Sequence, residues 1–206
     1  RLLCANRAAR VGLSPAFDAI GQDGHACIGR VAALDEQSMV IEVLQSTAGL
    51  GLEGTRVRLR PEPLLFGVGP NLLGRIFDSV GRPIDGGPPV AARARMRIEG
   101  LAINPSWRAL PRDFIETGVS AIDLLNSLVR GQKLPLFSAG GLPHDRIATE
   151  IAQRARLRGG ASSDFAVVFA GMGVPHDTAE QFRLAMESSG ALGHTVLFLN
   201  LADEPG

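Results

Sequence analysis

One short stretch has the outline of a phosphate-binding loop, a device that holds nucleotides. FSAGGLPHDRIATEI, residues 137–151, runs from apolar residues through a glycine-bearing turn into a helical pattern. Loops of the pattern GxxxxGK(S/T) surround phosphates with backbone N–H groups at the start of a helix. Their lysine reaches the terminal phosphates, and their hydroxyl binds Mg²⁺. The order of features in this stretch therefore indicates a site related to nucleotide binding.

The residues at the defining positions differ from those that this chemistry needs. Ser138 takes the place of the first glycine, and Pro143, which has no N–H to donate, takes that of the second. His144 replaces the lysine, and Asp145 replaces the hydroxyl. At about 4 Å two unit charges interact by about 4 kcal/mol at an effective dielectric constant of about 20, so a carboxylate here opposes phosphate binding. We predict weak or no nucleotide binding by this degenerate loop, which comprises Ser138, Ala139, Gly140, Gly141, Leu142, Pro143, His144 and Asp145.

The rest of the chain does not supply the missing cation. Lys133 is the only lysine among 21 basic residues, and it lies before the loop. Asp145 suits the start of a helix, because an acidic residue in the first turn satisfies the helix dipole without a ligand. We therefore predict no catalytic residue in this chain.

A second Pro-His-Asp sequence follows 32 positions later, where GVPHD repeats the pattern of GLPHD. A metal site formed by His144, Asp145, His176 and Asp177 is one reading of this repeat. Proline followed by aspartate also commonly begins a helix. We favour a helix start with Asp177 and Glu180 as a capping box, and we predict no metal.

The elements that must position the loop alternate between helix and strand after Phe114. The patterns predict a helix over 119–131, a strand over 133–137, a helix over 145–156, a buried strand over 165–173, a helix over 177–189 and a buried strand over 195–201. The first helix has Ile122, Leu125, Leu128 and Val129 on one face, and the second has a solvated ladder of Arg146, Glu150 and Arg154. This alternation predicts an α/β domain with a mostly parallel sheet.

The residues before this region predict a small all-β domain and an ordered connector. TRVRLR, residues 55–60, alternates as a half-exposed antiparallel strand does, and we predict that MVIEVL pairs with CIGRVAAL as a hairpin. Residues 67–90 are dense in glycine and proline, which indicates tight turns. We place the first domain at 1–66 and a partial nucleotide-binding-type α/β domain at 67–206, with the connector at 67–113.

Composition excludes several classes of protein. The chain has 206 residues, 45% of them hydrophobic, which is enough to form a core. Its formal net charge is zero, which argues against nucleic-acid binding. No apolar run is long enough to span a bilayer, and the two cysteines are not spaced as metal ligands. We expect a soluble protein of a reducing cytoplasmic compartment.

Four segments together resemble a known family. They are NLLGRIFDSVGRPIDGGPPV, the stretch from FIETGVSAID to FSAGGLPHDRIATEIA, FAVVFAGMGV and LFLNLADEP. They are similar to the head subunits of rotary ATPases, especially the B subunit of V-type and archaeal-type ATP synthases, from about Phe17 onward. FSAGGLPH resembles that non-catalytic subunit specifically. Catalytic relatives carry a general-base glutamate after AGxG, where this chain has Val174 and Pro175.

The resemblance implies a fold and a set of partners. The all-β part would be the N-terminal β-barrel that joins six subunits in a ring, and the α/β part would be RecA-like, as in P-loop NTPases. Non-catalytic B subunits would alternate with catalytic A subunits and contact the central stalk. ATP or ADP with Mg²⁺ would bind at the interface with the A subunit, and this chain alone would hold no cofactor. The complex would lie peripherally on the cytoplasmic face of a membrane and translocate protons.

The resemblance also implies further elements beyond Gly206, including an arginine that completes the catalytic site. We therefore expect a fragment or a truncated gene product. Two alternatives stay open. One is an active P-loop ATPase of the flagellar, secretion or F-type class, or a Rho-like helicase, each of which requires the loop lysine. The other is a truncated, free-standing interaction module.

Overall fold

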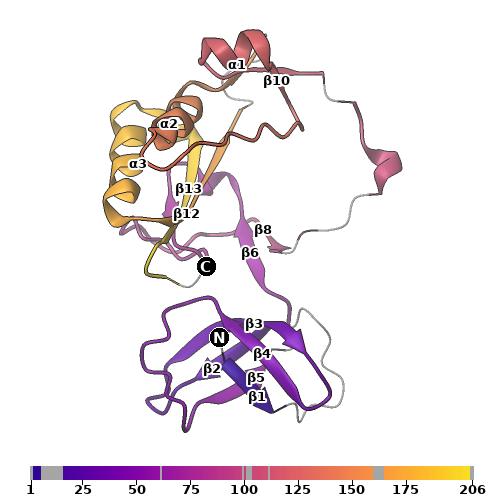
Figure 1. Ribbon diagram of the computed structural model, residues 1–206, viewed down its shortest axis with the longest axis vertical. Helices are drawn as coiled ribbons and strands as arrows, with labels where there is room; N and C mark the ends of the chain where they lie inside the picture. Colours follow the sequence, from indigo (N-terminus) through magenta and orange to yellow (C-terminus); the bar gives the residue numbers. More distant parts are fainter. Residues whose placement is uncertain are drawn as a thin grey trace.

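A β-sheet unit and an α/β unit follow one another along the chain in the computed structural model, and a two-stranded ribbon lies between them (Figure 1). The structure describes residues 2–5, 16–60, 62–98, 100, 104–110, 112–159 and 165–204. In these ranges no helix is long and apolar enough to cross a membrane.

The N-terminal unit is a curled antiparallel sheet. Its strands are β1 (Leu2–Ala5), β2 (Ala16–Ile20), β3 (Ala26–Leu34), β4 (Ser38–Val43) and β5 (Arg56–Leu59), in the order β1-β4-β3-β2-β5. The predicted hairpin is confirmed as β3 and β4, and alternate residues of β4 are buried, as one covered sheet face requires. Phe17, Val31, Met39 and Ile41 form one cluster of its core, and Ala19, Cys27 and Val43 form another. Among the described strands no pairing joins β1 to β5, so the closed barrel stays a prediction.

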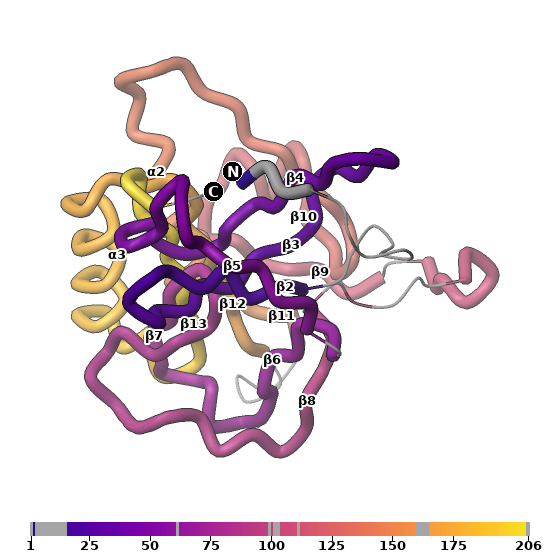
Figure 2. The backbone as a smooth tube through the Cα atoms, turned by 90° about the horizontal axis from the view of Figure 1, so that it is seen from below, coloured from indigo at the N-terminus to yellow at the C-terminus, as the bar shows by residue number. Residues whose placement is uncertain are grey.

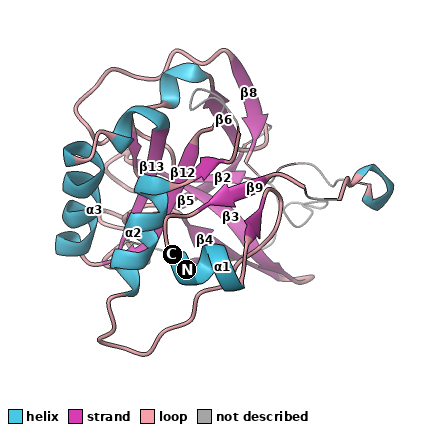
Figure 3. Ribbon diagram, turned by 90° about the horizontal axis from the view of Figure 1, so that it is seen from above, coloured by secondary structure: helices cyan, strands magenta, loops and turns pink. Residues whose placement is uncertain are grey.

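The predicted parallel sheet is confirmed, at a small size. It contains β12 (Val167–Val174), β13 (Thr195–Leu201) and β7 (Ile76–Phe77), in the order β12-β13-β7. The helices α2 (His144–Arg154) and α3 (His176–Ser188) lie together beside it (Figure 3). Their shared core contains Ile76, Ala152, Ala179, Phe182, Met186, Ala191, Leu197 and Leu199. One face of the sheet is therefore covered by helices.

Shorter elements complete the description. The ribbon consists of β6 (Leu65–Val68) and β8 (Ala94–Arg97), and a third sheet contains β9 (Phe114–Glu116), β10 (Leu128–Val129) and β11 (Arg156–Leu157). The other helices within the described residues are α1 (Ser120–Leu125), η1 (Pro70–Leu72), η2 (Pro105–Trp107) and η4 (Ala191–His194).

The predicted helix over 119–131 is wrong in its second half. It ends at Leu125, where Asn126 leaves the helical region with φ −133°. Leu128 and Val129 then pair with Ile115 and Phe114 of β9. These apolar residues had helical spacing, but tertiary pairing decided their conformation.

The predicted strand over 133–137 is also wrong. Residues 132–139 carry no regular structure, and Phe137 is 94% exposed. A strand must pair its backbone groups with a neighbour, and among the described strands none pairs with this segment. Figure 2 shows it as part of a long loop that swings away from the sheet before α2.

The strand predicted over 165–173 is confirmed as β12, but its expected burial is wrong on one face. Val167 and Phe169 pack against the helical core, whereas Val168 is 68% and Met172 is 82% exposed. A strand directs successive side chains to opposite faces, so one face of β12 remains uncovered.

The connector contributes a strand that the sequence patterns did not predict. Ile76 and Phe77 of β7 are buried and pair with Leu197 and Phe198 of β13. The rings of Phe77 and Phe198 stack with centroids 5.3 Å apart. The connector thereby contributes a strand to the parallel sheet itself.

An ion pair closes the turn that follows β7. Arg75 donates to both carboxylate oxygens of Asp85, at 2.5 and 2.9 Å, and to the carbonyl oxygen of Pro88 at 2.9 Å. Asp85 also accepts from the backbone N–H groups of Ile76 and Gly87. Because both charged side chains are less than one-fifth exposed, this pair is the main polar anchor of the connector.

We predict that Asp85→Asn destabilises the chain by about 2 kcal/mol, because the guanidinium loses its charged partner at a poorly solvated site. The midpoint of urea unfolding measures the change, and the slope should be unaltered. Asp203→Asn, at a 71% exposed carboxylate, is the control and should stay within about 0.5 kcal/mol of wild type. Equal changes in the free energy of unfolding for the two variants would contradict the role of the Arg75–Asp85 pair as an anchor.

A pH dependence follows from the same carboxylate. The Arg75 hydrogen bond, helped by the two backbone donors, holds the pKa of Asp85 well below its ordinary value of 3.8. A lowered folded-state pKa gives stability that is complete above the unfolded pKa and is lost as the pH falls toward the folded one. The stability difference between wild type and Asp85→Asn should therefore shrink below about pH 4. Urea unfolding at several pH values measures it, and a constant difference would contradict the assignment.

Candidate functional site

The eight residues of the degenerate loop lie at the start of α2. The helix begins at His144 with Pro143 before it, and no side chain caps its first N–H groups. Gly141 has φ +83°, a left-handed conformation that glycine adopts without strain. The predicted turn followed by a helix is thus present, although the strand before it is absent.

Two N–H groups at the end of this loop are committed to the loop itself. The N–H of Leu142 donates to the carbonyl oxygen of Ala139 at 3.3 Å, and that of His144 donates to the carbonyl oxygen of Leu142 at 2.8 Å. Pro143 has no N–H. A phosphate loop needs several of these donors to converge on one anion, and three consecutive positions here offer none.

The side chains of His144 and Asp145 turn toward each other and the loop. His144 Nδ1 lies 2.9 Å from the carbonyl oxygen of Leu142, and Nε2 lies 3.4 Å from a carboxylate oxygen of Asp145. Both side chains are about half exposed. The imidazole therefore lies between a carbonyl oxygen and a carboxylate of the chain itself.

The basic residue that follows is directed along the helix. Arg146 Nε donates to Glu150 at 3.1 Å, and Arg154 lies 3.8 Å from the same carboxylate. This confirms the predicted charge ladder on an exposed face of α2. Asp145 therefore places a negative charge at the start of the helix. This charge interacts favourably with the helix dipole and repels an anion.

The end of β12 carries no acid at the position expected for a general base. Val174 is packed against the helical core, and its carbonyl oxygen accepts from Ala202. Asn200 of β13 accepts the N–H of Gly173 at 3.1 Å. Beyond it, His176 Nε2 lies 3.3 Å from Asp203, so the ends of β12 and β13 are joined by polar contacts.

The capping box predicted for Asp177 and Glu180 is wrong. No side chain caps α3, Asp177 accepts from the N–H of Thr178, and Glu180 binds Arg183. The Arg183 guanidinium holds the pKa of Glu180 below its ordinary value. Glu180 therefore belongs to an exposed ion-pair cluster with Arg183 rather than to the helix start.

The structure does not assemble the alternative metal site. In the described part of the chain, no three His, Cys, Asp or Glu side chains gather in a way that could hold a metal ion. His144 contacts Asp145 and His176 contacts Asp203, each as a separate pair. The Pro-His-Asp repeat thus marks two helix starts.

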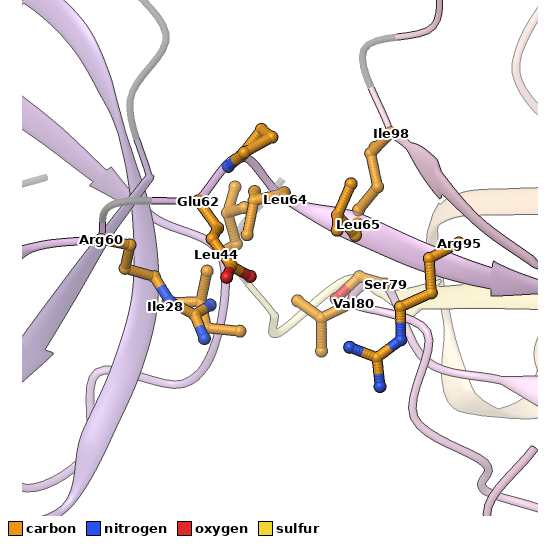
Figure 4. A pocket seen from close by; sticks show the side chains of 11 residues that line it. Ile28, Leu44, Arg60, Glu62, Leu64, Leu65, Ser79, Val80, Arg95 and Ile98 are labelled. Carbon is orange, nitrogen blue, oxygen red and sulfur yellow. The ribbon is translucent and has the colours of Figure 1, made fainter.

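Sequence reasoning missed two cavities that the ribbon helps to form. One, of about 500 Å³, lies where the N-terminal unit meets the ribbon, with Ile28, Leu44, Arg60 and Glu62 on one side and Arg95 and Ile98 on the other (Figure 4). A second, of about 570 Å³, lies between the ribbon and β12–β13. Their residues come from distant parts of the sequence, so no local pattern indicated them.

Comparison with known proteins assigns the chain. Residues 118–206 match the family model "ATP synthase alpha/beta family, nucleotide-binding domain". The chain is 48% identical over 95% of its length to the V-type ATP synthase beta chain of Halothermothrix orenii. It is 46% identical over 95% of its length to the A-type ATP synthase B subunit 1 of Methanospirillum hungatei, and 44% identical over 99% to the A-type ATP synthase B subunit of Aeropyrum pernix.

The chain spans less than half the length of these relatives, covering 42% of the first two and 44% of the third. Within that span the similarity includes the curled N-terminal sheet, the connector and the small parallel sheet. On this similarity, the chain belongs to the ATP synthase alpha/beta family, with the B subunits of V-type and A-type ATP synthases.

Proposed function

We propose that the chain acts as a non-catalytic, regulatory and structural B subunit of a V-type or A-type proton-translocating ATPase. It would alternate with catalytic A subunits in a hexameric head and contact the central stalk. The names of its relatives support the assignment to such a complex. The complex would associate peripherally with the cytoplasmic face of a membrane.

The observation that carries the non-catalytic part of this proposal is the hydrogen bonding at the start of α2. Leu142 and His144 donate their N–H groups within the loop, and Pro143 has none. The carboxylate of Asp145 adds negative charge where a phosphate would bind. Because donors and charge both oppose a phosphate, ATP or ADP with Mg²⁺ would bind at the interface with the A subunit and not to this chain alone.

The two alternatives receive different support. An active P-loop ATPase is not favoured, because the relatives are named as a V-type beta chain and A-type B subunits and the loop lacks its lysine. A free-standing interaction module has no specific observation in its favour.

We predict that the chain binds Mg·ATP with a dissociation constant above about 1 mM, because the loop offers neither a cation nor convergent donors. Isothermal titration calorimetry measures it. The matched variant carries Ser138→Gly, Pro143→Gly, His144→Lys and Asp145→Thr, which restores the residues of an active loop. This variant should bind at least about tenfold more tightly than wild type. Micromolar binding by wild type that is lost in His144→Ala would overturn the non-catalytic proposal.

We also predict that the chain co-purifies with the catalytic A subunit of a V-type or A-type enzyme when the two are co-expressed. Size-exclusion chromatography with mass measurement reports the complex, and a catalytic subunit of an F-type enzyme is the control. If the chain binds the F-type catalytic subunit but not the V-type or A-type subunit, it belongs with the F-type enzymes and this prediction is wrong.

A further inference from the structure

The cavity of Figure 4 combines an apolar lining with charged groups on both of its walls. Its volume of about 500 Å³ falls within the range of about 300–1,000 Å³ that small-molecule sites occupy. One wall comes from the N-terminal unit and the segment that leaves it, and the other comes from the ribbon and the turn after β7. We call it the junction cavity. Its apolar lining includes Ile28, Leu44, Leu65, Val80 and Ile98.

Hydrogen bonds within the chain hold these walls in place. On the side of the N-terminal unit, the N–H of Leu44 donates to the carbonyl oxygen of Ile28 at 2.8 Å. On the other side, β6 and β8 pair along their length, and Asp78 accepts the N–H of Val80 at 3.0 Å in the turn after β7. Because the backbone around the cavity is already ordered, a ligand would lose little affinity to ordering of the protein.

Two opposite charges face the cavity from opposite walls. Figure 4 shows Glu62 on the side of the N-terminal unit and Arg95 on the side of the ribbon. Within the described residues neither side chain makes an ion pair or hydrogen bond. Arg60, which also lines the cavity, lies 3.4 Å from Asp18, so its charge is partly neutralised. In the described lining, one anion and one cation are therefore available to a ligand, with apolar surface between them.

This pattern of charges favours a ligand that carries both signs. A simple anion at Arg95 would also experience repulsion from Glu62, and a simple cation at Glu62 would experience repulsion from Arg95. A linear molecule with a cation at one end, an anion at the other and a carbon chain between them satisfies both walls. Its carbon chain also removes apolar surface of the cavity from water.

We propose that the junction cavity binds a linear zwitterion, with its ammonium group at Glu62, its carboxylate at Arg95 and its carbon chain along the apolar lining. Two sources share this chemistry. One is a free ω-amino acid, and the other is the C-terminal lysine of a polypeptide, whose ε-ammonium and carboxylate are joined by apolar carbons.

A matched set of small probes tests the proposal by isothermal titration calorimetry. We expect 6-aminohexanoate to bind the chain with a dissociation constant below about 1 mM. Hexanoate lacks the cation, hexylamine lacks the anion, and glycine lacks the carbon chain, so each should bind at least about tenfold more weakly. Nα-acetyl-lysine represents a C-terminal lysine, and the tighter of it and 6-aminohexanoate identifies the source. Binding of neither zwitterion, or equal binding of hexanoate, would overturn the proposal.

Two variants assign the two ends of the ligand. Glu62→Gln should weaken binding of 6-aminohexanoate about tenfold without weakening that of hexanoate, and Arg95→Gln should do the same without weakening that of hexylamine. Both side chains are exposed, so the fold should be retained, which circular dichroism checks. The controls Glu36→Gln and Arg108→Gln, at exposed sites outside the cavity, should leave binding unchanged. Unchanged affinity in either cavity variant would contradict the assignment.

A double-mutant cycle tests whether the two charges are instead partners of each other. The free energy of unfolding is measured without ligand for wild type, Glu62→Gln, Arg95→Gln and the double variant. We expect the two changes to add, and a coupling between them would overturn the proposal, because the cavity would then close on itself. These measurements involve neither nucleotide nor the A subunit, so their failure leaves the proposed function standing, and the reverse also holds.

Discussion

The pairing of β7 with β13 is the contact on which the arrangement of the molecule depends. Ile76 and Phe77 leave the connector and enter a parallel sheet whose other strands lie about a hundred residues later. Arg75 and Asp85 hold the turn closed directly beside this strand. A segment rich in glycine and proline has little regular structure of its own, so burial of two apolar side chains and one well-bonded ion pair together give it a defined place.

This arrangement divides the α/β unit into two unlike faces. On one side α2 and α3 cover the sheet, with Phe182 and Met186 buried against it. On the other side only the ribbon lies over the strands, and Met172 projects from an open surface. The degenerate loop begins the covered side, and the cavity of about 570 Å³ lies on the other.

The degenerate loop differs from an active phosphate loop in a few residues, and these residues decide its chemistry. An active phosphate loop gains its affinity from N–H groups that have no other partner and from a lysine. Here Pro143 removes one donor, its neighbours Leu142 and His144 satisfy the loop's own carbonyl groups, and Asp145 reverses the charge. The same residues form a stable helix start, because an acid in the first turn complements the dipole. The residues that form this helix start are therefore the same ones on which the proposal of weak phosphate affinity rests.

Local patterns were sufficient where neighbours in the sequence are neighbours in space. The hairpin of β3 and β4 and the helices α2 and α3 followed from spacing and residue type. Prediction failed where distant contacts compete with local preference. Leu128 had helical spacing but pairs with Ile115, and residues 133–137 had strand character but find no partner strand in the described structure.

The sequence by itself thus determined which residues stand at the start of α2, and with them the sign of the charge there, because these properties belong to the side chains. Only the tertiary structure decided that Ile76 joins β13, that one face of β12 is open, and that Arg95 lines a cavity. These features depend on which surfaces stay uncovered after distant parts of the chain have packed together. No local sequence pattern shows that outcome.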